Sequence, residues 1–277
     1  MRLVGIRRDR RVWIGVDVDG AVSPIAEVDD FYADVRRSLD RAHGITGGEA
    51  SPGAIELAPP VPPSARVICV GLNYRAHAAE GRFEVPEHPT IFGRWTASLT
   101  VSGTPAPVNA NEPGLDWEGE VAAIVGERLT DVDPPRAAAG VMGYAVFNDL
   151  TSRRAQKLTQ QWTLGKNGDR SGPMGPIVCA DEVGDLSAGL RIQTRVNGTV
   201  VQDGNTRDMI FSVGDLLSRI SRTLTLNPGD VVVTGTPEGV GYVRNPPWYL
   251  TPGDVVEVEV ERLGTLRTPI VAATERP

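Results

Sequence analysis

The chain has 277 residues, of which 40% are hydrophobic and 23% charged, as is typical of a soluble globular protein. From this length we expect one large domain and one small one. Its 28 basic and 35 acidic residues give a net charge of -7, and no block of Lys or Arg follows a predicted helix face. We therefore expect no nucleic acid and no membrane as a partner. No apolar run is as long as a signal peptide or a spanning helix, so we expect a cytoplasmic protein.

The N-terminal region predicts a strand followed by a helix. Residues 11–18 alternate apolar and polar side chains and precede an Asp-Gly pair at 19–20, a pattern typical of a strand that enters a hairpin turn. Asp29 and Asp30 can then cap a helix that Gly44 can end. The apolar residues that recur every three or four positions between them are Phe31, Val35, Leu39 and Ala42.

The Pro-rich stretch 58–64 predicts a stiff linker between two domains. We place a small N-terminal α+β domain at residues 1–62 and a larger domain at residues 63–277. Strands dominate the larger domain, with turns rich in Gly, Pro and Asn between them. The predicted strands are 66–74, 120–126, 143–149, 175–180, 191–198, 230–235 and 254–260. Ser212 and Asp215 have capping-box spacing ahead of an apolar stripe, which predicts a helix.

Two cysteines, Cys69 and Cys179, stand far apart in the sequence inside apolar strand-like segments. In such surroundings a cysteine usually behaves as a small hydrophobic residue. We therefore expect two buried thiols rather than a disulfide.

Three acidic residues share one face of a predicted strand. Side chains in a strand alternate between faces, so Asp116, Glu118 and Glu120 point together with the apolar Ala122 and Ile124. The carboxylates thus stand at the mouth of a core, where burial raises at least one pKa unless a cation neutralises the charge. A hard metal ion is the simplest neutraliser. The alternative for Glu118 and Glu120 is an exposed strand edge with Lys or Arg partners.

A histidine and a glutamate three residues apart form a second candidate feature. One helical turn would place His77 and Glu80 on the same face. Imidazole titrates near neutral pH, and a carboxylate beside it can hold its proton, so the pair can activate a water molecule. A common His-Glu contact in a surface loop is the alternative.

Other polar residues follow strand ends. Asp149 ends an apolar strand ahead of a helix predicted over 152–162, where it is either a ligand or a helix cap. Lys166 lies in a Gly- and Pro-rich loop of a chain that relies on Arg for nearly all its positive charge. It is either solvated or a stabiliser of an oxyanion. Thr236, in the glycine-rich segment 234–241, can bind a small carboxylate.

Seven motifs occur in the order GLNYRAHAAE, LDWEGEVAAIVG, GYAVFNDLTSR, LGKNGDRSGPMGP, VNGTVVQ, TLNPGDVVVTGTPEGVG and LTPGDVVEVEVERLGTL. Over about residues 65–272 the sequence therefore resembles the fumarylacetoacetate hydrolase family, in its branch of acylpyruvate hydrolases and hydroxyheptadienedioate isomerases. The resemblance implies a mainly β fold with few helices, a mixed β-sandwich roll behind the small N-terminal domain. It also implies a homodimer with a divalent metal, Mg²⁺ or Mn²⁺.

Carried over position by position, the resemblance assigns roles to ten residues. The metal ligands are Glu118, Glu120 and Asp149, with Asp116 left outside that set. The catalytic residues are His77 and Glu80, on a mobile lid over about residues 76–90, and Lys166. The substrate contacts are Gln156, Thr236, Asn73 and Arg94. Positions 94, 154 and 168 depart from the family's usual residues, and Gly168 leaves room or flexibility beside the lysine.

The implied activity is hydrolysis of a carbon-carbon bond in a 2,4-dioxo acid of the acylpyruvate or fumarylpyruvate type, through a metal-bound enolate. His77 and Glu80 would activate water and Lys166 would stabilise the oxyanion. Isomerases, tautomerases and decarboxylases that act on oxaloacetate or a hydroxyheptadienedioate pass through the same species, so these alternatives stay open, as does a role in aromatic compound catabolism. A metal-dependent small-molecule binding protein without turnover is the non-enzymatic alternative.

Overall fold

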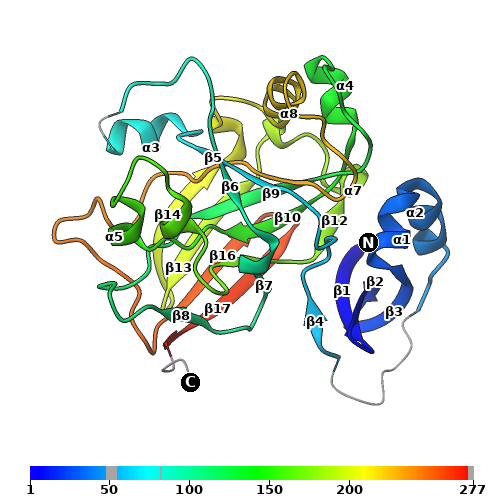
Figure 1. Ribbon diagram of the computed structural model, residues 1–277, viewed down its shortest axis with the longest axis horizontal. Helices are drawn as coiled ribbons and strands as arrows, with labels where there is room; N and C mark the ends of the chain where they lie inside the picture. Colours follow the sequence, from blue (N-terminus) through cyan, green and yellow to red (C-terminus); the bar gives the residue numbers. More distant parts are fainter. Residues whose placement is uncertain (48–54, 82, 274–277) are drawn as a thin grey trace.

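The computed structural model describes residues 1–47, 55–81 and 83–273 and shows a mainly β protein (Figure 1). The strands are β1 (Arg2–Arg8), β2 (Arg11–Val18), β3 (Ala21–Glu27), β4 (Leu57–Ala58), β5 (Val67–Gly71), β6 (Thr90–Arg94), β7 (Leu99–Val101), β8 (Ala106–Val108), β9 (Gly119–Val125), β10 (Val141–Asn148), β11 (Gly172–Met174), β12 (Ile177–Cys179), β13 (Arg191–Val196), β14 (Thr199–Asn205), β15 (Val231–Val233), β16 (Val255–Val260) and β17 (Gly264–Ala272). The α-helices are α1 (Val28–Ala33), α2 (Val35–His43), α3 (Arg75–Glu80), α4 (Pro134–Ala139), α5 (Arg153–Gln156), α6 (Thr163–Lys166), α7 (Ala180–Val183) and α8 (Val213–Ser221). None of the helices in these residues is long and apolar enough to cross a membrane.

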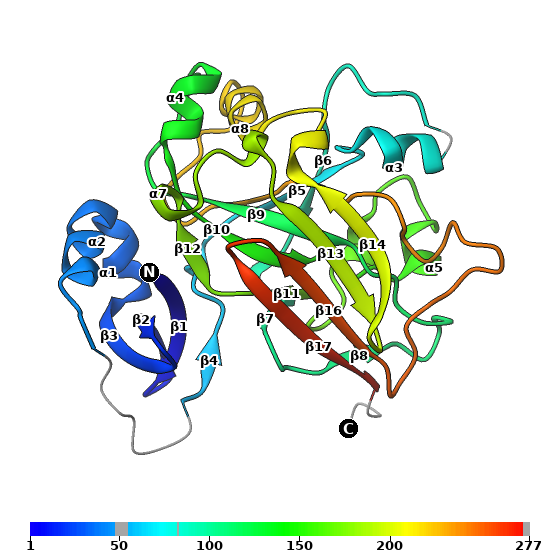
Figure 2. The same ribbon diagram turned by 180° about the vertical axis from the view of Figure 1, so that it is seen from behind.

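Two sheets form the roll. The large sheet has the order β3-β2-β1-β12-β10-β9-β15-β5-β6, with β4, β7 and β11 attached beside this path. It is mixed, because β15 pairs parallel with β5 and antiparallel with β9. The smaller sheet has the order β14-β13-β16-β17-β8, and β14, β13, β16 and β17 lie side by side in Figure 2. The predicted fold class is confirmed.

The N-terminal strands and helices lie to one side of the molecule (Figure 1). Strand β1 nevertheless pairs antiparallel with β12, so the small sheet β1–β3 continues the large one. The predicted linker is packed rather than free, because the Tyr32 hydroxyl donates to the Pro60 carbonyl oxygen at 2.7 Å and Val61 is buried. The division of the chain between residues 62 and 63 stays a prediction.

The helix predicted between Asp29 and Gly44 is in fact two helices. Asp34 separates α1 from α2 with φ -145° and ψ 78°, and its side chain accepts a hydrogen bond from the Arg37 N–H. This is an N-cap, whose side chain satisfies a backbone donor that the start of a helix leaves free. Gly44 ends α2 as predicted. The prediction of one helix over 152–162 was also wrong, since α5 ends at Gln156 and α6 begins only at Thr163.

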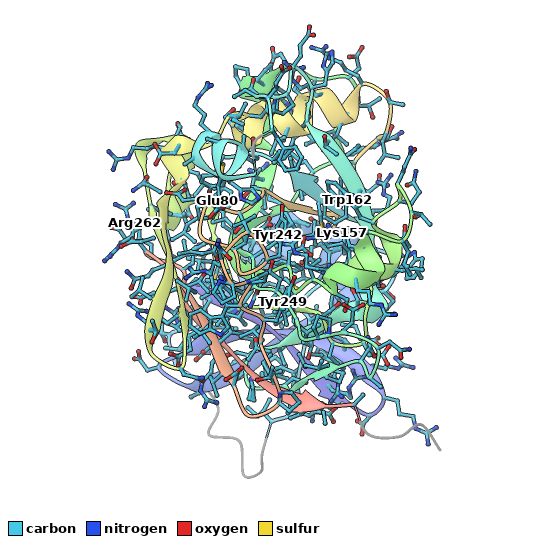
Figure 3. The ribbon with its side chains drawn as sticks, turned by 90° about the vertical axis from the view of Figure 1, so that its left-hand side faces the viewer. Glu80, Lys157, Trp162, Tyr242, Tyr249 and Arg262 are labelled. Atoms are coloured by element: carbon cyan, nitrogen blue, oxygen red, sulfur yellow. The ribbon has the colours of Figure 1, made fainter. Side chains whose placement is uncertain are left out.

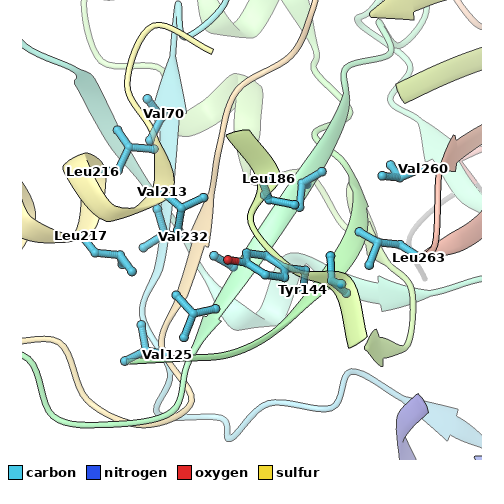
Figure 4. Close-up of a cluster of buried hydrophobic side chains, with 14 of the residues drawn as sticks. Val70, Val125, Tyr144, Leu186, Val213, Leu216, Leu217, Val232, Val260 and Leu263 are labelled. Carbon is cyan, nitrogen blue, oxygen red and sulfur yellow. The ribbon is translucent and has the colours of Figure 1, made fainter. Parts of the chain in front are cut away.

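Strand β9 divides the core. Val121 and Ala123 pack into the hydrophobic cluster shown in Figure 4, whereas Ala122 and Ile124 pack into a second cluster beneath the N-terminal strands. The alternation predicted for this strand is therefore confirmed, although β9 begins only at Gly119. The capping box of α8 is present, and both cysteines are buried and free, as expected.

Candidate active site

The register between β9 and β10 brings three carboxylates together. Phe147 pairs with Glu120, and the Asp149 N–H donates to the Glu118 carbonyl at 2.9 Å, so Asp149 lies directly across from Glu118. Opposite residues on neighbouring strands share a face, and Glu120 follows Glu118 along that face. One carboxylate oxygen from each residue lies within 4.8 Å of the others, and the residues are 6%, 2% and 1% exposed. An exposed edge is therefore excluded.

Three cations, Lys166, Arg94 and Arg153, neutralise part of this charge. Lys166 Nζ donates to Glu118 at 2.6 Å and to Asp149 at 2.7 Å, while Arg94 Nε donates to Asp149 at 3.1 Å. Lys166 is the last residue of α6 and is 2% exposed, so it is neither a loop residue nor solvated. Burial raises the pKa of Glu118, but Lys166 and Arg153 together lower it to about 2. The Asp149 side chain thus pairs with Lys166 and Arg94 and does not cap α5, whose N-cap position is Ser152.

Glu120 is the carboxylate that these cations leave unpaired. Its side chain accepts a hydrogen bond from the Gly235 N–H at 2.6 Å, and no ammonium or guanidinium of the described residues forms an ion pair with it. Burial, with the neighbouring Asp149 and Glu118, raises the pKa of Glu120 well above its usual range. A hard divalent cation with oxygen ligands would remove this repulsion. The residues present therefore fit the predicted divalent metal.

Arg153 belongs to the site although the sequence analysis did not single it out. It donates to Asp116 at 2.7 Å, to Glu118 at 2.5 Å and to Gln156 at 3.0 Å. Asp116 thus supports the site from outside the triad. The neighbouring Arg154, which departs from the family's usual residue, is exposed. The i,i+3 spacing of Arg153 and Gln156 is the signal that could have identified the pair.

His77 and Glu80 share one face of α3, as predicted. His77 Nδ1 lies 3.3 Å from Glu80 Oε2, and the Gly239 N–H donates to Glu80 Oε1 at 3.0 Å. His77 is 8% exposed, which excludes a contact in a surface loop. Gly239 has φ +101°, and a Cβ there would lie 2.2 Å from the Val201 carbonyl oxygen, so only glycine fits beside the dyad. The mobility of residues 76–90 stays a prediction, and residue 82 lies outside the described part of the chain.

A cavity of about 320 Å³ is lined by two of the triad carboxylates and by His77 of the dyad. Its wall includes Glu118, Glu120, Lys166 and His77, together with the predicted substrate contacts Gln156 and Thr236. It also includes aromatic residues and a lysine that the sequence analysis did not single out, and Figure 3 labels three of them, Lys157, Trp162 and Tyr242. The sequence contains no pattern that would mark these residues as part of a site, because they become neighbours only in the folded chain.

Asn73 and Arg94 lie behind this wall rather than in it. The Asn73 amide donates to the Thr234 carbonyl at 2.7 Å and to the Phe211 carbonyl at 3.1 Å, and it accepts from the Phe211 N–H at 2.8 Å. Arg94 binds Asp149 and donates to Ser171 Oγ at 2.7 Å. Both residues thus hold segments of the site in place, and direct contact of either with substrate stays a prediction.

Residues 66–271 match the family model described as Fumarylacetoacetate (FAA) hydrolase C-terminal. The chain belongs to the fumarylacetoacetate hydrolase family. It is 37% identical over 256 residues to oxaloacetate tautomerase YisK from Bacillus subtilis, a match that covers 89% of this chain and 84% of that protein. The family resemblance of the seven motifs is thus confirmed.

Two solved structures show how the family's chemistry varies on this fold. A 5-carboxymethyl-2-hydroxymuconate delta-isomerase from Mycobacterium smegmatis superposes with a TM-score of 0.79 at 32% identity, covering 99% of this chain and 100% of that one. A fumarylpyruvate hydrolase from Pseudomonas aeruginosa, in complex with Mn²⁺ and pyruvate, superposes with a TM-score of 0.69 at 32% identity, covering 80% and 94%. The relatives thus include tautomerases, isomerases and hydrolases of small acids.

Proposed function

We propose that this chain is a divalent-metal-dependent keto-enol tautomerase of a 2-oxo acid of the oxaloacetate type. The observation that carries the proposal is the position of Lys166, whose ammonium lies between Glu118 and Asp149. A 2-oxo group held at the carboxylate triad would meet this ammonium. A carbonyl further along the substrate would not, which favours chemistry at the 2-oxo end over hydrolysis at a distal carbonyl.

The triad Glu118, Glu120 and Asp149 would hold Mg²⁺ or Mn²⁺, because carboxylates alone suit these ions better than Zn²⁺. When bound, the ion would supply a Lewis acid that acidifies the C3 protons of the 2-oxo acid. The Mn²⁺ in the Pseudomonas aeruginosa relative supports this choice.

The residues around the cavity provide the proton transfer. Glu80 holds the proton of His77 Nδ1, which leaves Nε2 free to take a proton from C3. Lys166 donates a hydrogen bond to the 2-oxo oxygen as negative charge develops there. That oxygen takes a proton from water as the enol forms, and His77 gives to water the proton that it took from C3. The reverse steps return the keto form, so atoms and charge balance.

Hydrolysis of an acylpyruvate is the second candidate, as the sequence resemblance implies. The His77–Glu80 pair is equally suited to activate a water molecule, and the solved fumarylpyruvate hydrolase is 32% identical to this chain. In that reaction the oxyanion would need a donor at the distal carbonyl.

Kinetics on the purified enzyme would separate the candidates. We expect Mg²⁺- or Mn²⁺-loaded enzyme to accelerate the decay of enol-oxaloacetate, to cleave acetylpyruvate and fumarylpyruvate far more slowly, and to lose both activities in chelator. Carbon dioxide release would be measured in parallel to detect a decarboxylase. Cleavage of an acylpyruvate without any effect on oxaloacetate would overturn the tautomerase assignment. Binding without turnover of any substrate would leave the non-enzymatic alternative.

The small 2-oxo acid is the partner that this proposal requires. We retain the homodimer and the cytoplasmic location as proposals, supported by the family resemblance and by the composition of the chain. Size-exclusion chromatography with light scattering would test the first, and a monomer at assay concentration would overturn it.

A further inference from the structure

The positive charges of this chain are distributed unevenly between the two basic residue types. Of the 28 basic residues, 26 are Arg and two are Lys, at positions 157 and 166. Both lysines line the same cavity. A primary ammonium on a flexible stem thus occurs only where a small molecule would bind, and the role of Lys157 is not explained by the proton transfer described above.

The two lysines differ in their partners. Lys166 is buried and pairs with Glu118 and Asp149. Lys157 follows α5 and is exposed, and within the described residues its ammonium has one contact, the face of the Tyr242 ring at 4.8 Å from the centroid. No carboxylate of this acidic protein neutralises it within that part of the chain. Its charge therefore remains available to an anion in the cavity.

Tyr242 is itself fixed in place. The Arg153 guanidinium carbon lies 4.2 Å from its ring centroid on the cavity wall, and the Tyr242 N–H donates to Asp116 at 3.2 Å. A ring held in this way attracts a cation to its face. Tyr242 therefore keeps the flexible Lys157 side chain close to the cavity that both residues line. Figure 3 labels the two residues.

Part of the cavity wall is aromatic. Lys166 Nζ lies 5.1 Å from the Phe92 ring centroid, and the Phe92 and Trp162 rings make an edge contact at 5.3 Å. Phe92 and Trp162 both line the cavity. A ligand held at the triad thus lies beside an uncharged part of the wall, and the same cavity offers it a second cation, Lys157.

We propose that Lys157, held by Tyr242, binds a second carboxylate at the distal end of the substrate. The inference rests on the proposed function, since it assumes that the 2-oxo end is held at Glu118, Glu120 and Asp149. It makes Lys157 a specificity-determining residue that selects short 2-oxo dicarboxylates over 2-oxo acids with an uncharged end.

Calorimetry with two unreactive ligands tests the inference apart from turnover. Malate and 2-hydroxybutyrate share a 2-hydroxy carboxylate, and malate alone has a distal carboxylate. We expect metal-loaded wild type to prefer malate, and Lys157→Met to weaken malate binding about tenfold, typical of losing a hydrogen bond between charged groups, with 2-hydroxybutyrate unchanged. Lys157→Arg should retain most of the preference.

Arg154→Met provides the matched control. Arg154 is an exposed residue of α5, beside Arg153 in the sequence, and it does not line the cavity. Its replacement therefore removes one positive charge near the site without removing a contact with the ligand. If Arg154→Met and Lys157→Met weaken malate binding equally, the effect is due to net charge, and the inference is overturned. The inference is also overturned if Lys157→Met weakens the binding of malate and of 2-hydroxybutyrate equally.

Steady-state kinetics then connect the subsite with the reaction. In Lys157→Met we expect KM for oxaloacetate to rise about tenfold with kcat little changed. We expect inhibition by oxalate, which has no group beyond the 2-oxo end, to be unchanged. If wild type prefers malate but does not tautomerise oxaloacetate, the proposed function fails and the subsite stands. If oxaloacetate is tautomerised with the same KM in both proteins, the subsite fails and the function stands.

Discussion

The two ends of the cavity hold their charged groups in different ways. At the inner end, Glu118, Asp149 and Lys166 are buried and joined by short hydrogen bonds, and strand register determines their positions. At the outer end, Lys157 is exposed and contacts only the face of an aromatic ring among the described residues. Buried charge without a partner is costly, whereas exposed charge is screened by water. Substitutions at the inner end should therefore have large effects, and those at the rim small ones.

The largest effect is expected for Lys166→Met. Loss of a buried donor at the 2-oxo oxygen should lower kcat for oxaloacetate tautomerisation by a factor on the order of 10² to 10³, with a smaller change in KM. Stopped-flow kinetics of wild type and variant, beside Arg154→Met as an exposed control, would measure it. A kcat within threefold of wild type, roughly 0.7 kcal/mol, would show that the ammonium does not contact the reacting group.

Glu120→Gln should have the next largest effect. Because Glu120 is the triad carboxylate without a cation, its neutral isostere should reduce Mg²⁺ affinity on the order of 100-fold and raise the Tm of the metal-free protein by relieving repulsion. Calorimetry and thermal melts in chelator would give both quantities. The control is Glu127→Gln, since Glu127 is an exposed acid paired with Arg136. A lower metal-free Tm with unchanged Mg²⁺ affinity would contradict the assignment.

Asn73→Ala distinguishes the structural contacts of this residue from the predicted contact with substrate. Three hydrogen bonds to buried backbone groups should be lost, so the free energy of unfolding should fall by about 3 kcal/mol while KM of the folded enzyme stays the same. Urea unfolding and KM at low temperature would be measured together. Asn205→Ala, which removes a half-buried amide that caps a short 3-10 helix, should cost under about 1 kcal/mol. A raised KM with little loss of stability would instead establish the substrate contact.

The smallest effect is expected at the rim. Tyr242→Leu removes the ring that holds Lys157 and should raise KM for oxaloacetate about two- to fivefold, the size of an exposed cation-π contact. Tyr242→Phe keeps the ring face and serves as the control, with KM near that of wild type. An equal rise in both variants would assign the effect to the hydroxyl group.

Local patterns in the sequence were sufficient for several parts of the site. The alternation along residues 118–124 indicated that Glu118 and Glu120 share a face that continues into the core. The spacing of His77 and Glu80 placed them on one helical face, and Ser212 with Asp215 marked the start of α8. The ordered motifs identified the family. Each of these depends on residues within a few positions of one another, or on motif order, so the linear sequence determined them.

Only the tertiary structure decided how the distant parts meet. Lys166 bonds to a carboxylate 48 residues earlier in the chain, and the Asn73 amide binds the backbone 138 residues later. Arg153 meets Asp116 and Glu118 only in the folded chain, and Lys157 becomes a neighbour of Tyr242 only when the loop that carries the ring packs over α5. Strand register and packing bring these groups together, and the energy of a buried ion pair depends on the exclusion of water by the whole fold. The sequence determined which chemical groups are available, and the fold decided which carboxylate lacks a cation and which lysine is free for substrate.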